Sequence, residues 1–228
     1  MKKPRVDYTG FCLRELRNPR FSHLLLLLSW VWYLVMFFLT ENLIPAERCV
    51  PVHIRLDDWI PFCEWFLIPY VLWYGLIVFS LGWFLIYDVD CFKRLQIYIM
   101  ITQVCAMAVY ILMPNRQDLR PEVLPRDNFL TRGVALLYRI DTNTGVCPSL
   151  HVAYSLAIAS VWLKRHQTRW YWKVLLVILV VLICLSTVFL KQHSAADFFA
   201  ALPVCLLGEL LVYGKDYWLP QWRKYPTV

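Results

Sequence analysis

The sequence predicts an all-α, polytopic membrane protein with six transmembrane helices in one bundle. Of its 228 residues 60% are hydrophobic, 16% are aromatic and only 17% are charged, and the mean hydropathy is +0.51. Soluble domains average about 25% charged residues. A helix needs about 20 mostly apolar residues to cross the hydrocarbon core of a bilayer. Six such segments can be drawn, at 22–43, 66–86, 95–113, 148–163, 172–190 and 195–213.

The segment before the first apolar run, residues 1–21, is basic and is expected to lie at the membrane interface. The run at 22–43 is not expected to be a cleaved signal peptide, because it is too long and the following LTENLIPAER lacks a small-residue cleavage site. The six helices make one transmembrane domain over 22–213. Residues 214–228 are expected to form a cytoplasmic tail.

The positions of Lys and Arg indicate the orientation, because these residues are retained in cytoplasmic loops near helix ends. With both termini in the cytoplasm, most of the 23 Lys and Arg residues lie on the cytoplasmic side. Eight then lie on the opposite side and need another explanation: Arg48, Arg55, Arg116, Arg120, Arg126, Arg132, Arg139 and Lys191.

The remaining composition excludes some classes of function. The net charge of +7 is attributed to the cytoplasmic Lys and Arg and to anionic lipid headgroups, and no nucleic-acid partner is predicted because no basic segment interleaved with aromatic residues occurs. No Gly-rich phosphate loop is present either. None of the eight Cys residues forms a CxxC pair. A disulfide among Cys49, Cys63 and Cys147, which share the outer side, is left open.

Ionisable side chains at the ends of membrane helices are functional candidates, because they are costly to place there. Ser149 and His151 occur in TGVCPSLHVAYSLA at the start of the fourth helix, whose first turn can accept Pro148. His193 and Asp197 occur in FLKQHSAADFFAAL, between the fifth and sixth helices. Because they are four residues apart, they share one helical face if the sixth helix begins early enough.

The two histidines are predicted to lie on the same side of the membrane. From His151 the chain crosses the membrane twice before it reaches His193. The connection 114–147, the longest in the chain, ends on that side and brings Arg116 and Arg120 with it. Two His, one Asp, one Ser and several Arg are the side chains that an anionic phosphate ester requires.

These residues have two other interpretations. A single His at a membrane edge is usually an interfacial residue with satisfied hydrogen bonds, but a pair with matching topology, Asp197 and Ser149 is less easily explained in this way. Zinc is the second alternative, because His and Asp are zinc ligands. No HExxH, CxxC or second close His pair occurs, so neither a metal nor a cofactor is predicted.

These residues resemble the type 2 phosphatidic acid phosphatase superfamily, whose signatures are K-x6-R-P, PSGH and SR-x5-H-x3-D. PSLH at 148–151 is similar to the second signature, and Ser186, His193 and Asp197 match the spacing of the third. With the six-helix plan, the resemblance covers most of the chain. PSLH and KQH look more like the branch of inositol-phosphorylceramide synthases and sphingomyelin-synthase-like proteins than the ordinary lipid phosphatases.

The chain departs from these signatures at three positions. Leu150 stands at the Gly of PSGH, and Thr187 stands at the Arg of the third signature. Arg120 can serve as the Arg of the first signature, but Met113 occupies the position of its Lys. Two of the family's phosphate-binding cations are therefore replaced, which leaves open whether the acceptor of the phosphoryl group is water or an alcohol.

The resemblance implies a mechanism. His193 would be the nucleophile that takes the phosphoryl group, Asp197 would orient its ring, and His151 would protonate the leaving oxygen and then accept a proton from the incoming acceptor. The implied phosphate-binding residues are Arg120, Lys191, Ser149 and Arg116. Neither a metal nor a cofactor is required.

The implied function is that of a multi-pass lipid-phosphate phosphatase of the cell membrane, with an extracytoplasmic active site that hydrolyses a phosphate ester or diphosphate of a lipid. A lipid phosphotransferase that moves a phospho-headgroup to a lipid alcohol is the main alternative, and a non-catalytic lipid-binding scaffold is the third. The expected partners are a lipid-phosphate substrate and membrane lipids. The sequence specifies neither the lipid nor the oligomeric state.

Overall fold

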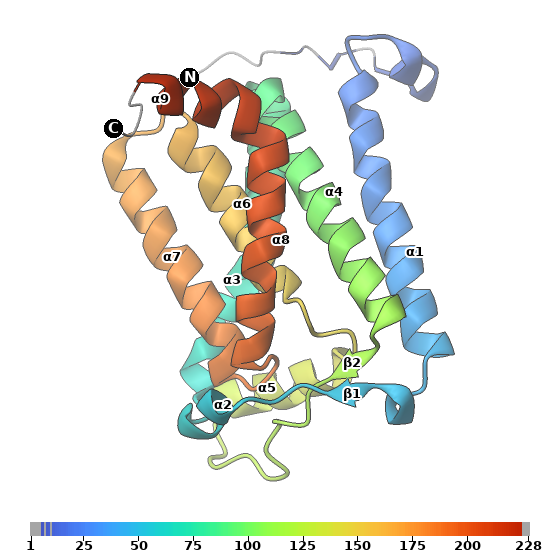
Figure 1. The fold of residues 1–228 in the computed structure, drawn as a ribbon, viewed down its shortest axis with the longest axis vertical. Coiled ribbons are helices and arrows are strands. Elements are labelled where there is room, and N and C mark those ends of the chain that lie inside the picture. The colour runs from blue at the N-terminus through green and yellow to red at the C-terminus, as the bar shows by residue number, and fades with distance from the viewer. Residues whose placement is uncertain (1–5, 7, 10, 225–228) are drawn as a thin grey trace.

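A computed structural model describes residues 6, 8, 9 and 11–224, and these residues are almost entirely helical. The all-α prediction is therefore confirmed. The long helices lie side by side in one bundle (Figure 1). Within the described residues, five helices are long and apolar enough to cross a membrane: Ser22–Leu43, Glu64–Tyr87, Val89–Leu112, Trp170–Phe189 and Ala195–Gln221.

Three of the long helices are joined to shorter helical turns. A 3₁₀ helix, Ser22–Leu27, precedes α1 (Leu28–Leu43), and another, Glu64–Phe66, precedes α3 (Leu67–Tyr87). α8 (Ala195–Tyr213) continues through a π-helical turn, Gly214–Trp218, into α9 (Leu219–Lys224). The other helices of the bundle are α4 (Val89–Leu112), α6 (Leu150–Lys164) and α7 (Trp170–Phe189).

The two long connections of the chain lie together at one end of the bundle, at the bottom of Figure 1. They contain the short helices α2 (Arg55–Trp59) and α5 (Phe129–Ile140) and a 3₁₀ turn, Ala46–Arg48. The strands β1 (Val50–Pro51) and β2 (Asn115–Arg116) join these connections as a parallel pair, with Val50 opposite Asn115.

Both ends of the described chain lie at the other end of the bundle, where α9 and a 3₁₀ helix at Leu13–Arg17 are found (Figure 1). The expected interfacial segment and the expected tail are only partly described. Lys2, Lys3 and Arg5 lie outside the described residues, as do residues 225–228.

The expected fourth membrane segment corresponds to α6, which is shorter than the other helices of the bundle. Its 15 residues span about 22 Å at 1.5 Å per residue, whereas the hydrocarbon core is about 30 Å thick. The six-helix count therefore stays a prediction. The start of α6 also differs from expectation, because Ser149 is the N-cap and Pro148 precedes the helix.

α6 lies at the centre of the bundle and packs against α3, α4, α7 and α8. Its Val152, Ala157 and Ile158 are fully buried. α1, in contrast, contributes no buried side chain and packs mainly against α4. Its exposed apolar side chains are the kind of surface that contacts lipid in a membrane.

α4 and α8 approach closely at one glycine. The ring of Tyr98 lies so close to Gly208 that a Cβ atom at this position would overlap it. The Tyr98 hydroxyl donates a 2.6 Å hydrogen bond to the Cys205 carbonyl. Small residues at helix contacts are typical of membrane bundles, because they let neighbouring backbones come together.

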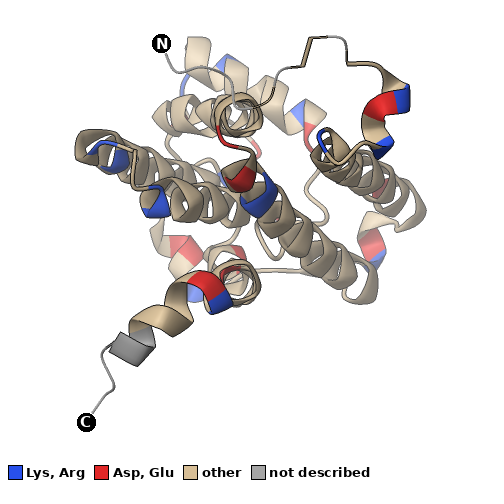
Figure 2. Cartoon of the chain, turned by 90° about the horizontal axis from the view of Figure 1, so that it is seen from above, with Lys and Arg blue, Asp and Glu red and all other residues tan. Residues whose placement is uncertain are grey.

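Two ion pairs fix α6 at the end of the bundle where the chain termini lie. Lys164 Nζ is 2.7 Å from Glu209 Oε1 in α8, and Arg165 Nε is 2.9 Å from Asp88 Oδ2 between α3 and α4. Seen from this end, the charged residues lie mostly at helix ends and in connecting turns (Figure 2). These pairs hold one end of α6, while His151 lies at the other.

Candidate active site

The turn between α7 and α8 carries His193. The carbonyl of Thr187, near the end of α7, accepts hydrogen bonds from the backbone N–H groups of Gln192 and His193, both at 3.0 Å. Lys191 has a φ of 52°, in the left-handed region, so the chain turns back sharply toward α8. His193 therefore lies before the first residue of α8 and does not share a helical face with Asp197.

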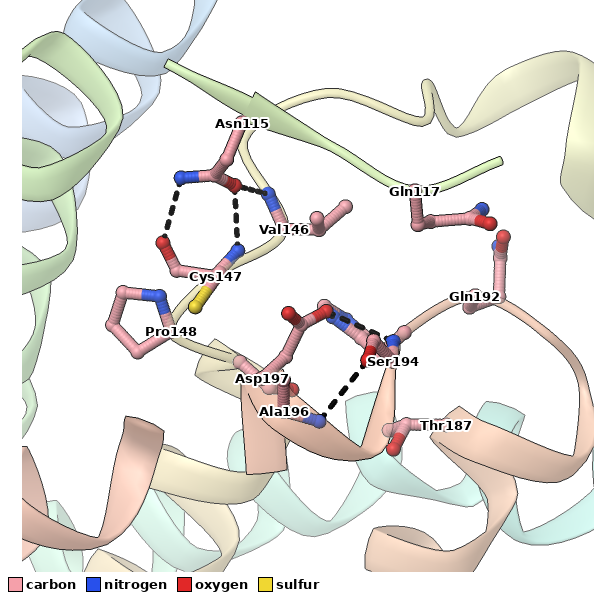
Figure 3. Close-up of polar contacts among 12 residues, drawn as sticks. Asn115, Gln117, Val146, Cys147, Pro148, Thr187, Gln192, Ser194, Ala196 and Asp197 are labelled. Atoms are coloured by element: carbon pink, nitrogen blue, oxygen red, sulfur yellow. Dashed lines mark hydrogen bonds and ion pairs between the residues drawn. The ribbon is translucent and has the colours of Figure 1, made fainter. Parts of the chain in front are cut away.

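The N-terminal cap of α8 orients the imidazole of His193. Asp197 Oδ2 accepts a 3.1 Å hydrogen bond from the Ser194 N–H and lies 3.0 Å from His193 Nδ1. Ser194 Oγ in turn accepts a hydrogen bond from the Ala196 N–H at 3.1 Å (Figure 3). This reciprocal arrangement is a capping box. With Nδ1 bound to the carboxylate, Nε2 is the ring nitrogen left for chemistry.

A buried carboxylate of α2 supports this cap. Asp57, whose exposed fraction is 2%, accepts hydrogen bonds from Ser194 Oγ at 2.6 Å and from the Ala195 N–H at 2.7 Å. The Lys191 ammonium donates to the carbonyls of Asp57 and Ile60 at 2.8 and 2.5 Å. The connection before α3 thus locks the turn that carries His193, and sequence reasoning assigned it no such role.

A second set of contacts joins the PSLH segment to α8. Asn115 Oδ1 accepts hydrogen bonds from the N–H groups of Val146 and Cys147 at 2.9 and 2.8 Å (Figure 3). The Ser149 N–H donates a 3.1 Å hydrogen bond to the Asp197 carbonyl. The start of α6 and the start of α8 are therefore held together by their backbones, and this contact brings the two histidines close to each other.

His151 lies across from His193. The two ring centroids are 5.5 Å apart, with an interplanar angle of 65°. The His151 ring also contacts Trp73 and Tyr70 of α3, at centroid distances of 4.0 and 4.5 Å. Its Nε2 atom is buried and has no hydrogen-bond partner among the described residues. Because an unpaired buried nitrogen is costly, a hydrogen-bonding ligand or water fits at this position.

Three of the four sequence-predicted phosphate ligands have other partners. Arg120 donates to the carbonyls of Tyr138 and Thr142 at 3.1 and 2.8 Å, and Arg116 pairs with Asp118 at 3.0 Å. The Lys191 ammonium is bound to carbonyls, as described above. Burial lowers the pKa of both Arg120 and Lys191.

The fourth predicted ligand, Ser149, caps α6. Its exposed fraction is 0%, and its hydroxyl accepts a hydrogen bond from the Val152 N–H at 3.5 Å. His151, His193 and Asp197 are thus brought together, whereas the side chains of Arg120, Arg116, Lys191 and Ser149 do not line the pocket beside them.

This pocket, of about 370 Å³, lies beside the two histidines and is lined by residues of α1, α3, α4 and α6, the connection between α5 and α6, and the turn before α8. Its polar lining includes His151, His193, Gln192 and Asp141. Asp141 Oδ2 accepts hydrogen bonds from the Tyr70 hydroxyl and from Gln192 Nε2, both at 3.2 Å. Burial raises the pKa of Asp141, although the charges of His193 and Arg120 oppose the shift.

Asp141 and Gln192 were not identified from the sequence. Asp141 lies in the long connection 114–147, directly after the amphipathic helix α5, which was not predicted from the sequence, and Gln192 carries no charge. The only sequence feature that points to these two residues is their position near the histidines. Gln192 directly precedes His193, and Asp141 lies ten residues before His151.

The described part of the chain holds neither a cluster of metal ligands nor a disulfide. There, no group of three or more His, Cys, Asp or Glu side chains is placed to hold a metal ion. All eight cysteines lie in this part and are free thiols, so Cys49, Cys63 and Cys147 form no disulfide. Burial raises the pKa of Cys147 to about 12, with the nearby Asp197 adding to the shift.

Comparison with known proteins gives no relative for this chain: no family model, no curated protein and no solved structure matches it.

Proposed function

We propose that the chain is an integral membrane enzyme that cleaves a phosphate ester of a lipid through a phosphohistidine at His193, with water as the acceptor. The observation that carries this proposal is the arrangement of three side chains. Asp197 holds Nδ1 of His193 at 3.0 Å, and His151 lies across from the same ring at a centroid distance of 5.5 Å. A nucleophile, its orienting carboxylate and an acid–base partner are the groups that such a transfer requires.

The proposed reaction has two steps. The lone pair of His193 Nε2 attacks phosphorus, the bond between phosphorus and the lipid oxygen breaks, and His151 gives its proton to the leaving oxygen. Water then attacks the phosphohistidine and gives a proton to His151 while the phosphorus–nitrogen bond breaks. Asp197 stabilises the positive charge that develops on the His193 ring in the first step.

The proposed setting is the cell membrane. In this arrangement α6 crosses the membrane as the fourth of six helices, both termini are cytoplasmic and the two histidines lie on the extracytoplasmic side. The five helices of spanning length and the cytoplasmic preference of Lys and Arg support it. The lipid tails would stay between helices while the headgroup reaches the histidines, and membrane lipids would be the main partners.

A lipid phosphotransferase is the second candidate, and the lining of the pocket favours it. Most of the residues around the pocket are aromatic or aliphatic, a surface on which a lipid alcohol can lie beside the histidines. The two candidates share His193, Asp197 and His151 and differ only in the acceptor. Product analysis separates them, because hydrolysis releases a water-soluble phosphate compound and transfer yields a new phospholipid.

The test is cleavage of a panel of phospholipids by the purified protein in detergent with EDTA present. We expect His193→Ala to abolish cleavage and Asp197→Asn to lower it strongly. The matched control is His53→Ala, because His53 is an exposed histidine of the same end of the bundle that pairs with Asp58. Full activity of both His193→Ala and Asp197→Asn on every substrate of the wild type would refute the proposal.

A further inference from the structure

A second cavity, which we call the lateral groove, lies at the end of the bundle opposite the two histidines. Its volume is about 650 Å³, and it is lined by side chains from 76–83 of α3, Trp162 of α6, the turn 165–169 and 171–179 of α7. This turn joins α6 to α7 at the end of the bundle where both ends of the described chain lie (Figure 1). No residue lines both cavities, so the lateral groove is separate from the candidate active site.

Apolar side chains form most of the lateral groove. The rings of Phe79 and Trp162 stack at a centroid distance of 6.2 Å, and Leu175 and Leu179 lie on the α7 side. Phe79, Trp172 and Leu175 are each more than half exposed, although α3 and α7 are long enough to cross a membrane. Apolar side chains exposed on such helices face the hydrocarbon core, so the lateral groove is open to lipid along its side.

The lateral groove extends over the depth of one leaflet. α7 has 20 residues and is about 30 Å long at 1.5 Å per residue, which matches the thickness of the hydrocarbon core. Leu179, the last residue of α7 in the lining, lies halfway along this helix. A lipid whose headgroup lies at the turn 165–169 can therefore place an acyl chain along the lateral groove as far as the middle of the bilayer.

The end of the lateral groove at this turn carries positive charge. Arg165 pairs with Asp88 at 2.9 Å, whereas Arg169 is exposed and donates a 2.9 Å hydrogen bond to the uncharged Tyr171 hydroxyl. Among the described residues, no Asp or Glu lines the lateral groove. The Arg169 guanidinium thus keeps N–H donors for an anion, and arginine can bind two phosphate oxygens at once.

Two other side chains of the lining have polar atoms that lack a partner. Thr168 Oγ1 and Trp83 Nε1 are buried and form no hydrogen bond with any described residue. The indole nitrogen can only donate, and the threonine hydroxyl can donate as well. Leaving such groups unpaired is costly, and the phosphate and ester oxygens of a lipid are acceptors that would satisfy them.

We propose that the lateral groove binds one anionic phospholipid from the leaflet at this end of the bundle, with the phosphate at Arg169 and an acyl chain along α7 as far as Leu179. A net negative headgroup suits the charge of the turn, whereas a zwitterionic headgroup would bring its ammonium group close to Arg169. Basic pockets between membrane helices are typical sites for anionic headgroups.

This inference goes beyond the proposed function, because it assigns a lipid site that takes no part in the chemistry at His193. It rests only on the membrane setting of that proposal. The expected occupant is therefore a lipid that stays bound without being cleaved.

The first test identifies the lipids retained by the full chain in native mass spectrometry. The protein carries His193→Ala, so that no lipid is turned over, and is mixed in detergent with equal amounts of dioleoyl phosphatidylglycerol and dioleoyl phosphatidylcholine. These lipids have the same chains and differ in headgroup charge. We expect one phosphatidylglycerol to be retained with a preference of about fivefold, the effect of one cationic side chain on an anionic lipid. Equal retention of the two lipids would overturn the proposal.

The second test adds Arg169→Gln to the same protein. This variant should reduce the preference for phosphatidylglycerol about fivefold, because the charge beside the phosphate is lost. The matched control is Arg17→Gln, at an exposed arginine of the same end of the bundle that lies outside the lateral groove, and it should leave the preference unchanged. An equal effect of both variants would show that general positive charge attracts the lipid, which contradicts the proposal.

The third test fills the apolar part of the lateral groove. Leu175→Trp should lower the retention of both lipids at least about fivefold, whereas the control Val177→Trp, at a partly exposed residue of α7 outside the lining, should not. Equal retention in these two variants contradicts the proposal. A dimer that retains no lipid and that dissociates in Leu175→Trp would also overturn it, because a second copy of the chain would then cover the lateral groove.

Cleavage assays with the wild type distinguish this inference from the proposed function. If no lipid is cleaved but phosphatidylglycerol is retained and lost as described, the lateral groove stands as a lipid site and the enzymatic proposal fails. If a lipid is cleaved and neither Arg169→Gln nor Leu175→Trp changes retention, the enzymatic proposal stands and the lipid site is refuted.

Discussion

Replacement of Asp57 by Ala tests whether α2 holds the turn that carries His193. The carboxylate accepts three hydrogen bonds, from Ser194 Oγ at 2.6 Å, from the Ala195 N–H at 2.7 Å and from the Ile54 N–H at 2.9 Å. The first two donors belong to the N-terminal cap of α8, which also orients the imidazole. Asp57→Ala removes the acceptor and leaves these donors in a buried site.

The expected loss in the free energy of unfolding is about 3 kcal/mol. A buried donor left without an acceptor costs about 1–3 kcal/mol. The Ala195 N–H cannot be redirected, whereas the Ser194 hydroxyl can rotate and recover part of its loss. Unfolding in mixed micelles, followed by circular dichroism, measures the change. Cleavage should fall as well, because the cap no longer fixes the His193 ring.

The matched control is Asp58→Ala at the adjacent position. The Asp58 side chain is 61% exposed and pairs with His53, so its removal should cost less than about 1 kcal/mol. If Asp57→Ala and Asp58→Ala unfold at the same denaturant concentration, the role assigned to Asp57 is wrong.

Three further predictions concern charged side chains. Glu209→Gln should lower the free energy of unfolding by about 3 kcal/mol, because it leaves the largely buried Lys164 ammonium without its carboxylate partner and, among the described residues, with only the Ser160 hydroxyl as a hydrogen-bond acceptor. Adding Lys164→Met should recover part of this loss in the same unfolding assay. Lys191→Met should lower the free energy of unfolding by about 2 kcal/mol, because two hydrogen bonds to carbonyl groups are lost. It should leave calorimetric binding of dodecyl phosphate unchanged, and a large loss of binding would show that Lys191 is a phosphate ligand. Because burial raises the pKa of Asp141, the folded state keeps a proton at pH values where the unfolded chain has lost it. The free energy of unfolding should therefore fall as the pH rises from about 4 through the raised pKa. The same dependence on pH in Asp141→Asn would contradict this.

The bounds of a helix could be predicted from the sequence where the apolar run and the helix have the same length. The expected segment 66–86 differs by only two residues or fewer from Glu64–Tyr87 at each end. The expected segment 95–113 begins too late, since α4 starts at Val89. The residues before it include Asp90, Lys93 and Arg94, which indicate a polar loop. The helix nevertheless includes them, because its N-cap, Asp88, precedes all three in the chain.

The topology of the chain was enough to predict that the two histidines lie near each other, but it could not predict the hydrogen-bond partners of the charged side chains. Two membrane crossings between His151 and His193 are enough to expect both on one side. Nothing in the sequence distinguishes an arginine that faces a pocket from one that binds carbonyls, as Arg120 does. Asp57 and Asp141 were missed for the same reason, because the role of an acid in a connection between long helices is recognised only by its contacts.

The most direct test of the proposed function is to locate the phosphoryl group on the protein. The wild type is mixed with phospholipid labelled in the phosphate, quenched with dodecyl sulfate at alkaline pH and mapped by mass spectrometry. We expect label on His193 that is stable to alkali, lost in acid and absent from His193→Ala. Cleavage of the lipid by His193→Ala at the rate of the wild type, without label on any histidine, would contradict the account.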